Sequence, residues 1–118
     1  MRSFDSFDGI YLHRNTVDMR KSINGLSLIV SEEMELDIFG RYLFVFCNRR
    51  KNKLKVLYWD ETGFALWYKR LEKDKFRWPL KLEEEVIALS AEQLQWLLTG
   101  YDILKLKPHK KLQYQYVS

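Results

Sequence analysis

The stretch YLFVFCNRRKNKLKVLYWDETGFALWYKRL, residues 42–71, decides the fold of this chain. Apolar and aromatic residues recur at every second position in three runs, as they do in β-strands. The clusters NRRKN, residues 48–52, and DETG, residues 60–63, separate the runs and are rich in turn-forming residues. The pattern therefore predicts three antiparallel strands joined by two tight loops, a β-meander.

The turn chemistry of the two loops predicts a register. Gly63 has no Cβ, so it suits the left-handed position of a type I turn, which places Asp60 opposite Phe64. In the first loop we expect Cys47 opposite Lys53. This register gathers one apolar set on a single core face: Tyr42, Phe44, Phe46, Leu54, Val56, Tyr58, Phe64, Leu66 and Tyr68.

The same register places Lys55 directly opposite Lys69. Like charges at such positions destabilise a sheet by about 0.2–1 kcal/mol, so the pair needs a reason. One interpretation is an anion site; the other is a lysine-rich edge that keeps a second sheet from pairing there. The cations expected beside this pair are Arg49, Arg50, Lys51 and Arg70.

We expect an α+β fold, in which two helices pack on an antiparallel sheet of four to five strands formed by the meander and an edge strand. Residues 10–14 have the β preference of a short edge strand. Asp18 suits the N-cap of a helix that follows it, with an apolar stripe of helical period packed on the sheet. The stripe comprises Met19, Ile23, Leu26, Ile29 and Val30.

A second helix is expected from Ser90 to about Thr99. Ser90 and Gln93 have the spacing of a capping box, and Gly100 suits the left-handed stop. The buried side of this helix should hold Leu94, Leu97 and Leu98. Residues 105–118 are basic and then alternate, which fits either an edge strand or a basic arm.

Length and composition predict one cytoplasmic domain covering residues 1–118. A chain of 118 residues with 47% hydrophobic residues can bury a single core. It has neither an apolar run of about 20 residues nor a secretory leader, so we expect no membrane contact. The lone Cys47 excludes an internal disulfide and suits a small buried side chain.

Positive charge is concentrated in the meander region. Residues 41–81 hold twelve Lys or Arg against four acids, a net charge of +8, whereas the whole chain carries +4. Such a field attracts nucleic acid or an acidic protein.

Signals for catalysis are weak. His13 and His109 are isolated, the five glycines form no phosphate loop, and no nucleophile has a visible base partner. We therefore expect a protein that is not an enzyme and that uses neither a metal nor a cofactor.

Several strings of residues resemble one family of transposition proteins. The chain is similar to the TnpB accessory proteins encoded by the second reading frame of insertion sequences of the IS66 type, over about residues 8–104. The strings that carry this resemblance include Val17-Asp18-Met19-Arg20-Lys21, Asn48-Arg49-Arg50, Tyr58-Trp59-Asp60, Tyr68-Lys69-Arg70-Leu71-Glu72 and Trp78-Pro79. The chain departs from the family pattern at Ser22 and at Ala65-Leu66-Trp67, and nothing carries over to the tail after Pro108.

This resemblance implies a role in transposition of a bacterial mobile element, beside a separate transposase and without catalytic residues. The resemblance leaves two hypotheses for what the protein binds during transposition. It leaves the oligomeric state open. In the first, the protein binds DNA of the element through Arg20, Lys21, Arg49, Arg50, Lys51, Lys53, Lys55, Lys69 and Arg70. In the second, it is an adaptor that docks on the transposase through Trp59, Trp67 and Trp78.

Overall fold

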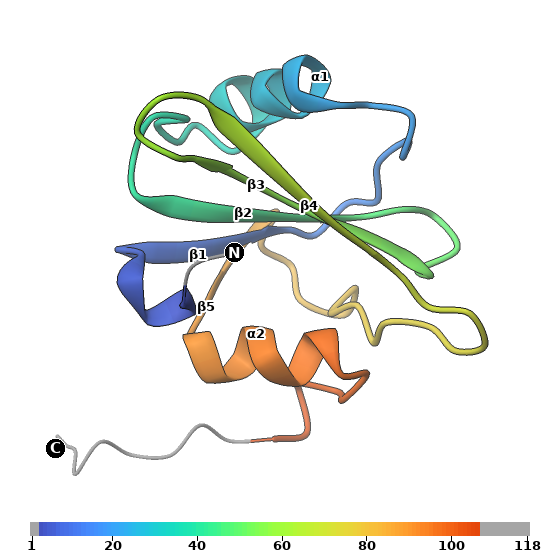
Figure 1. Ribbon diagram of the computed structural model, residues 1–118. Coiled ribbons are helices and arrows are strands. Elements are labelled where there is room, and N and C mark those ends of the chain that lie inside the picture. Colours follow the sequence, from blue (N-terminus) through green and yellow to red (C-terminus); the bar gives the residue numbers. More distant parts are fainter. Residues whose placement is uncertain (1–2, 107–118) are drawn as a thin grey trace, which may run out of the picture.

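Strand β2 (Tyr42–Cys47) lies at the centre of a five-stranded sheet in the computed structural model, which describes residues 3–106 (Figure 1). The strand order is β4-β3-β2-β1-β5. The other strands are β1 (Gly9–His13), β3 (Lys53–Trp59), β4 (Phe64–Arg70) and β5 (Val86–Leu89). Two α-helices, α1 (Ile23–Leu28) and α2 (Ala91–Leu98), a π-helical turn (Ile29–Glu33) and a 3-10 turn (Phe4–Ser6) complete the elements. The predicted α+β class is confirmed.

Strand β1 is an interior strand, so its prediction as an edge was wrong. It pairs in parallel with β2 on one side and antiparallel with β5 on the other. A parallel pair needs a long crossover connection, and residues 14–41 supply one that contains α1. The sheet is therefore mixed, and the predicted antiparallel meander describes β2, β3 and β4 only.

The register of the second hairpin differs from the predicted one by one residue. Trp59 pairs with Phe64, and the amide of Asp60 donates to the carbonyl of Gly63 at 2.7 Å. Glu61, with φ 55°, takes the left-handed conformation that we assigned to Gly63. The loop consequently holds one residue more than expected.

The first hairpin is shifted in the same way. Cys47 pairs with Leu54, and Lys51 adopts φ 61°. A slip of one residue moves every side chain of a strand to the opposite face of the sheet. The predicted single core face is therefore wrong, because its members divide between two faces.

Both faces of the sheet are buried, and each has its own core. Figure 1 shows α1 on one side of the sheet and α2 on the other. The α1 core contains Leu26, Ile29, Val30, Met34, Phe44, Phe46 and Leu57. The α2 core includes Leu12, Leu43, Val45, Leu54, Val56, Phe76, Leu94 and Leu97. Burial on both faces explains why β2 is apolar at every position.

Helix α1 begins later than predicted. Ser22 is its N-cap, whereas residues 19 and 20 form a turn, so Asp18 does not cap the helix. The expected packing on the sheet is confirmed, since Leu26, Ile29 and Val30 are buried against it.

Helix α2 agrees with its prediction. The Ser90 hydroxyl accepts from the Gln93 amide at 3.0 Å, and the Gln93 side chain accepts from the Ser90 amide at 2.9 Å. Leu94, Leu97 and Leu98 are buried, and Gly100 adopts φ 95° after the helix. The tail predicted as a strand or an arm lies, from residue 107 onward, outside the described residues.

Cys47 is buried at the end of β2, as its place in a predicted strand suggested. Burial raises the pKa of its thiol to about 12, so the side chain is neutral at physiological pH. Between residues 3 and 106, none of the helices has the length and apolar character needed to cross a membrane.

Candidate nucleic-acid interface

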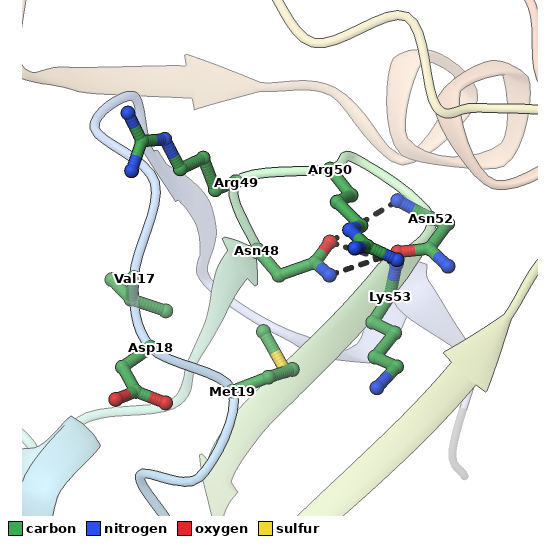
Figure 2. Close-up of a pocket in the computed structure, with 8 residues that line it drawn as sticks. All are labelled: Val17, Asp18, Met19, Asn48, Arg49, Arg50, Asn52 and Lys53. Atoms are coloured by element: carbon green, nitrogen blue, oxygen red, sulfur yellow. Dashed lines mark hydrogen bonds between the residues drawn. The ribbon is translucent and has the colours of Figure 1, made fainter.

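The loop between β2 and β3 is organised by Asn48. Its Oδ1 accepts from the amides of Asn52 at 3.1 Å and Lys53 at 3.0 Å, and its Nδ2 donates to Asn52 Oδ1 at 2.8 Å (Figure 2). An asparagine that bonds to the backbone a few residues further on is a common way to fix a turn. This network holds Arg49 and Arg50 at the exposed tip of the loop.

Residues 17–21 are anchored beside this loop. The amide of Val17 donates to the carbonyl of Cys47 at 2.9 Å. The ammonium of Lys55 donates to the carbonyls of Met19 and Lys21, each at 2.9 Å. Lys55 therefore fixes the 17–21 segment against β3, which was not foreseen from the sequence.

Two adjoining hollows lie between the 17–21 segment and the β2–β3 hairpin, and we call them together the basic groove. The smaller, of about 310 Å³, is lined by Val17, Asp18, Met19, Asn48, Arg49, Arg50, Asn52 and Lys53 (Figure 2). The larger, of about 460 Å³, is lined by Asp18, Met19, Arg20, Lys53, Lys55 and Tyr68. Lys53 lines both hollows and so connects them.

The cations of the basic groove are mostly uncompensated. Within residues 3–106, the side chains of Arg49, Arg50 and Lys53 have neither an ion-pair nor a hydrogen-bond partner. Arg49 and Arg50 are exposed, and Lys53 is half-buried. The positive charge predicted for the first loop therefore faces solvent in a concave surface.

Arg20 pairs with Asp18 in this groove. Its Nη2 lies 2.6 Å from Asp18 Oδ2, and its own amide donates to Asp18 Oδ1 at 2.9 Å. These two interactions lower the pKa of Asp18 to about 2. The sequence suggested that Asp18 caps a helix, and that Arg20 either contacts a ligand or pairs with a nearby carboxylate; the structure shows a local turn closed by an exposed ion pair between the two.

Replacing Arg20 with alanine is expected to return the pKa of Asp18 from about 2 toward its ordinary value of 3.8. The guanidinium provides the largest stabilisation of the carboxylate, so its loss raises the pKa. In the wild-type chain this contribution to stability is complete above the ordinary pKa and is lost as the pH falls through about 2. Titration of the Asp18 carboxyl by NMR measures both values, and Lys21→Ala is the control. An unchanged Asp18 pKa in Arg20→Ala contradicts the assignment.

Lys55 and Lys69 do not meet, so the predicted like-charge pair was wrong. Lys55 pairs with Tyr68 in the register, and Leu54 pairs with Lys69. Neighbours along a strand point to opposite faces, and Lys69 accordingly donates to the carbonyl of Leu98, at the end of α2, at 2.8 Å. Lys69 therefore lies away from the basic groove.

The other predicted cations are distributed around the groove. Lys21 is exposed beside Arg20, and Lys51 is half-buried in the first loop. Arg70 pairs with Lys53 in the register but forms an exposed ion pair with Glu72, with 2.8 Å between Nε and Oε2. None of these three lines either hollow.

Of the three tryptophans proposed as partner anchors, Trp67 and Trp78 belong to the α2 core, and Trp59 lies outside it. Trp59 is half-buried in edge-to-face contact with Phe39 and Phe64. Trp67 is half-buried against the α2 core. Trp78 is only 7% exposed, and its indole N–H donates to the carbonyl of Arg14 at 2.9 Å.

Sequence reasoning missed the roles of Asn48 and Tyr68. An asparagine at the start of a turn cluster can indicate side-chain hydrogen bonds to the backbone of the turn, but Asn48 was interpreted only as a turn-forming residue. Tyr68 was assigned to the core, whereas its side chain is 48% exposed on the outer strand β4. The one-residue register error concealed its position opposite Lys55.

Residues far apart in the chain meet at the basic groove, and they coincide with two strings that resemble the TnpB proteins: Val17 to Lys21, and Asn48 to Arg50. The chain belongs to the family described as IS66 Orf2-like proteins, whose model matches residues 8–108. It is therefore an insertion-sequence accessory protein of the TnpB type.

Two relatives from Sinorhizobium fredii are similar along most of their length. The uncharacterized protein y4hO is 38% identical over 93 residues, which cover 79% of this chain and 80% of the relative. The uncharacterized protein y4jC is 33% identical over 91 residues, which cover 77% of each chain. No solved structure matches this chain.

Proposed function

We propose that this accessory protein binds DNA of its insertion sequence through the basic groove. The observation that carries the proposal is a concave surface lined by the uncompensated cations Arg49, Arg50 and Lys53, which the β2–β3 hairpin places beside the 17–21 segment. Phosphates are the natural partners of such cations, because binding them releases counterions condensed on the DNA.

Hydrogen bonds fix the backbone on both sides of the groove, so the binding surface exists before DNA arrives. The Asn48 network fixes the loop that carries Arg49 and Arg50, and Lys55 fixes the segment opposite. Because these groups are already ordered, less conformational entropy is lost when a ligand binds. The role of Lys55 is to position the 17–21 segment rather than to act as a freely mobile phosphate ligand.

The double variant Arg49→Glu/Arg50→Glu is expected to weaken DNA binding and to reduce its salt dependence. Each lost phosphate contact reduces the log–log salt slope by about 0.9, so two contacts account for about 1.8. Fluorescence anisotropy with duplex DNA from the element ends, between about 50 and 200 mM salt, measures both quantities.

The matched control is Lys81→Glu/Lys105→Glu, which changes the charge equally at two exposed positions that do not line the groove. It should retain most of the salt slope of the wild-type chain. If both double variants weaken binding equally, only the net charge matters and the groove is not the interface. If the wild-type chain binds no DNA at the lower salt, the proposal fails.

We infer further that the protein acts without catalysing a reaction, in the cytoplasm beside the transposase. The ionisable groups among the described groove residues are five cations, the Tyr68 phenol and the Asp18 carboxylate. The carboxylate is paired with Arg20. The adaptor hypothesis has less support, because Trp78 is buried and Trp59 and Trp67 are each half-covered. Direct docking on the transposase stays an alternative that co-purification would test.

A further inference from the structure

Tyr68 places an aromatic ring in a groove whose charged residues are cations, apart from Asp18, which is paired with Arg20. Its side chain is 48% exposed and lines the larger hollow together with Arg20, Lys53 and Lys55. Within the described residues, Tyr68 is absent from both buried cores, in contrast to Leu66 and Trp67 beside it. A half-exposed ring among cations is the combination that single-strand-binding surfaces use, with rings for bases and cations for phosphates.

The ammonium of a lysine whose position is fixed lies over the ring of Tyr68. Lys55 is its cross-strand partner, and the Lys55 ammonium lies 6.0 Å from the ring centroid. That ammonium also donates to the carbonyls of Met19 and Lys21, so its own position is fixed. Tyr68 therefore lies on a sheet strand beside a lysine whose position is fixed. This arrangement limits the conformational entropy that the tyrosine side chain loses when a base stacks on it.

We propose that the basic groove holds single-stranded DNA, with one unpaired base stacked on the Tyr68 ring. This inference rests on the proposed function and names the form of DNA that the groove prefers. The bases of a duplex are already stacked and paired, so only an unpaired or extruded base can reach the ring. A volume of about 460 Å³ lies within the range of about 300–1,000 Å³ typical of sites for small organic groups.

Cations line both hollows of the groove, and the carboxylate of Asp18, which also lines both, is paired with Arg20. Among the groove cations, Lys53 alone lines both the larger hollow, which holds Tyr68, and the smaller hollow, which holds the loop arginines. Arg49 and Arg50 follow in the smaller hollow. Successive phosphates would therefore contact Lys53 and then the two arginines, while the Tyr68 ring selects strands that offer a free base.

The test compares three fluorescent DNA probes of about 12 nucleotides, a length within known site sizes for single-strand modules. They are an oligothymidylate, an abasic strand with the same phosphates, and a duplex. For the wild-type chain we expect the oligothymidylate to bind tightest. Tyr68→Ala should weaken its binding by about 5- to 150-fold and leave the abasic strand and the duplex nearly unchanged. Tyr68→Phe should retain the wild-type affinity, because it keeps the ring.

Tyr101→Ala is the matched control, since Tyr101 is 58% exposed after α2 and lines neither hollow. Thermal melting of each variant confirms that it is folded. Equal binding of the oligothymidylate and the abasic strand by the wild-type chain overturns the inference. So does a Tyr68→Ala effect of equal size on both strands, which would show that the ring only supports Lys55. If duplex binding still depends on Arg49 and Arg50 in either case, the proposed function stands while this inference fails.

Discussion

Replacing Lys55 with methionine should lower the free energy of unfolding by about 2–3 kcal/mol and also weaken DNA binding. The ammonium donates two hydrogen bonds to backbone carbonyls of the 17–21 segment. Hydrogen bonds from a charged donor each contribute about 1.5–3 kcal/mol, a figure that the partial exposure of Lys55 reduces. Methionine keeps the apolar stem, so the change isolates the ammonium. Urea unfolding followed by DNA anisotropy measures both effects.

Lys53→Met is the control for this prediction. Lys53 lies two residues earlier on β3, on the same face of the sheet, and no described residue accepts a hydrogen bond from its ammonium. Its loss should leave the free energy of unfolding within about 0.5 kcal/mol of wild type, as for ordinary surface changes, while removing one phosphate contact. If the two variants unfold alike, the positioning role of Lys55 is wrong.

Replacing Asn48 with alanine is expected to lower the free energy of unfolding by about 2–4 kcal/mol. Three hydrogen bonds of its side chain disappear, and two amides of the loop lose their acceptor. The loop should then open more often and expose Arg49 and Arg50 to trypsin. Limited proteolysis at that loop, together with urea unfolding, measures the effect.

Asn52→Ala is the comparison that makes this result specific. It removes only one of the three side-chain bonds and leaves both amides satisfied by Asn48. The expected loss is about 1 kcal/mol. Similar trypsin sensitivity in the two variants would mean that Asn48 does not organise the loop.

The parts of the fold that could be predicted from the sequence depend on local chemistry. The capping box at Ser90, the stop at Gly100 and the apolar residues of α2 each depend on neighbours within one or two turns. The apolar runs in residues 42–71 likewise predicted three strands, and the turn-forming cluster between the first two runs predicted the cationic loop at Arg49 and Arg50. These features are confirmed because the local preference and the tertiary packing favour the same structure.

The parts that could not be predicted depend on single conformations or on distant pairing. Glu61 takes a left-handed conformation that glycine was expected to need, and this changes the register of the hairpin. Burial of β2 on both faces removes the alternation that normally reveals which side is inward. For the site, the hydrogen bonds of Lys55 and Lys69 to carbonyls 29 or more positions away in sequence leave no local pattern.

The position of β1 between β2 and β5 determines when the basic groove can form during folding. Leu12 pairs with Ile87, 75 residues later, whereas β2, β3 and β4 are joined by short loops. Closing long loops is entropically costly, so the two hairpins should assemble before β1 and β5 dock. The 17–21 segment follows β1 directly and reaches the groove only when β1 has joined β2. A folding intermediate that has formed only the two hairpins would expose Arg49 and Arg50 but would lack the basic groove.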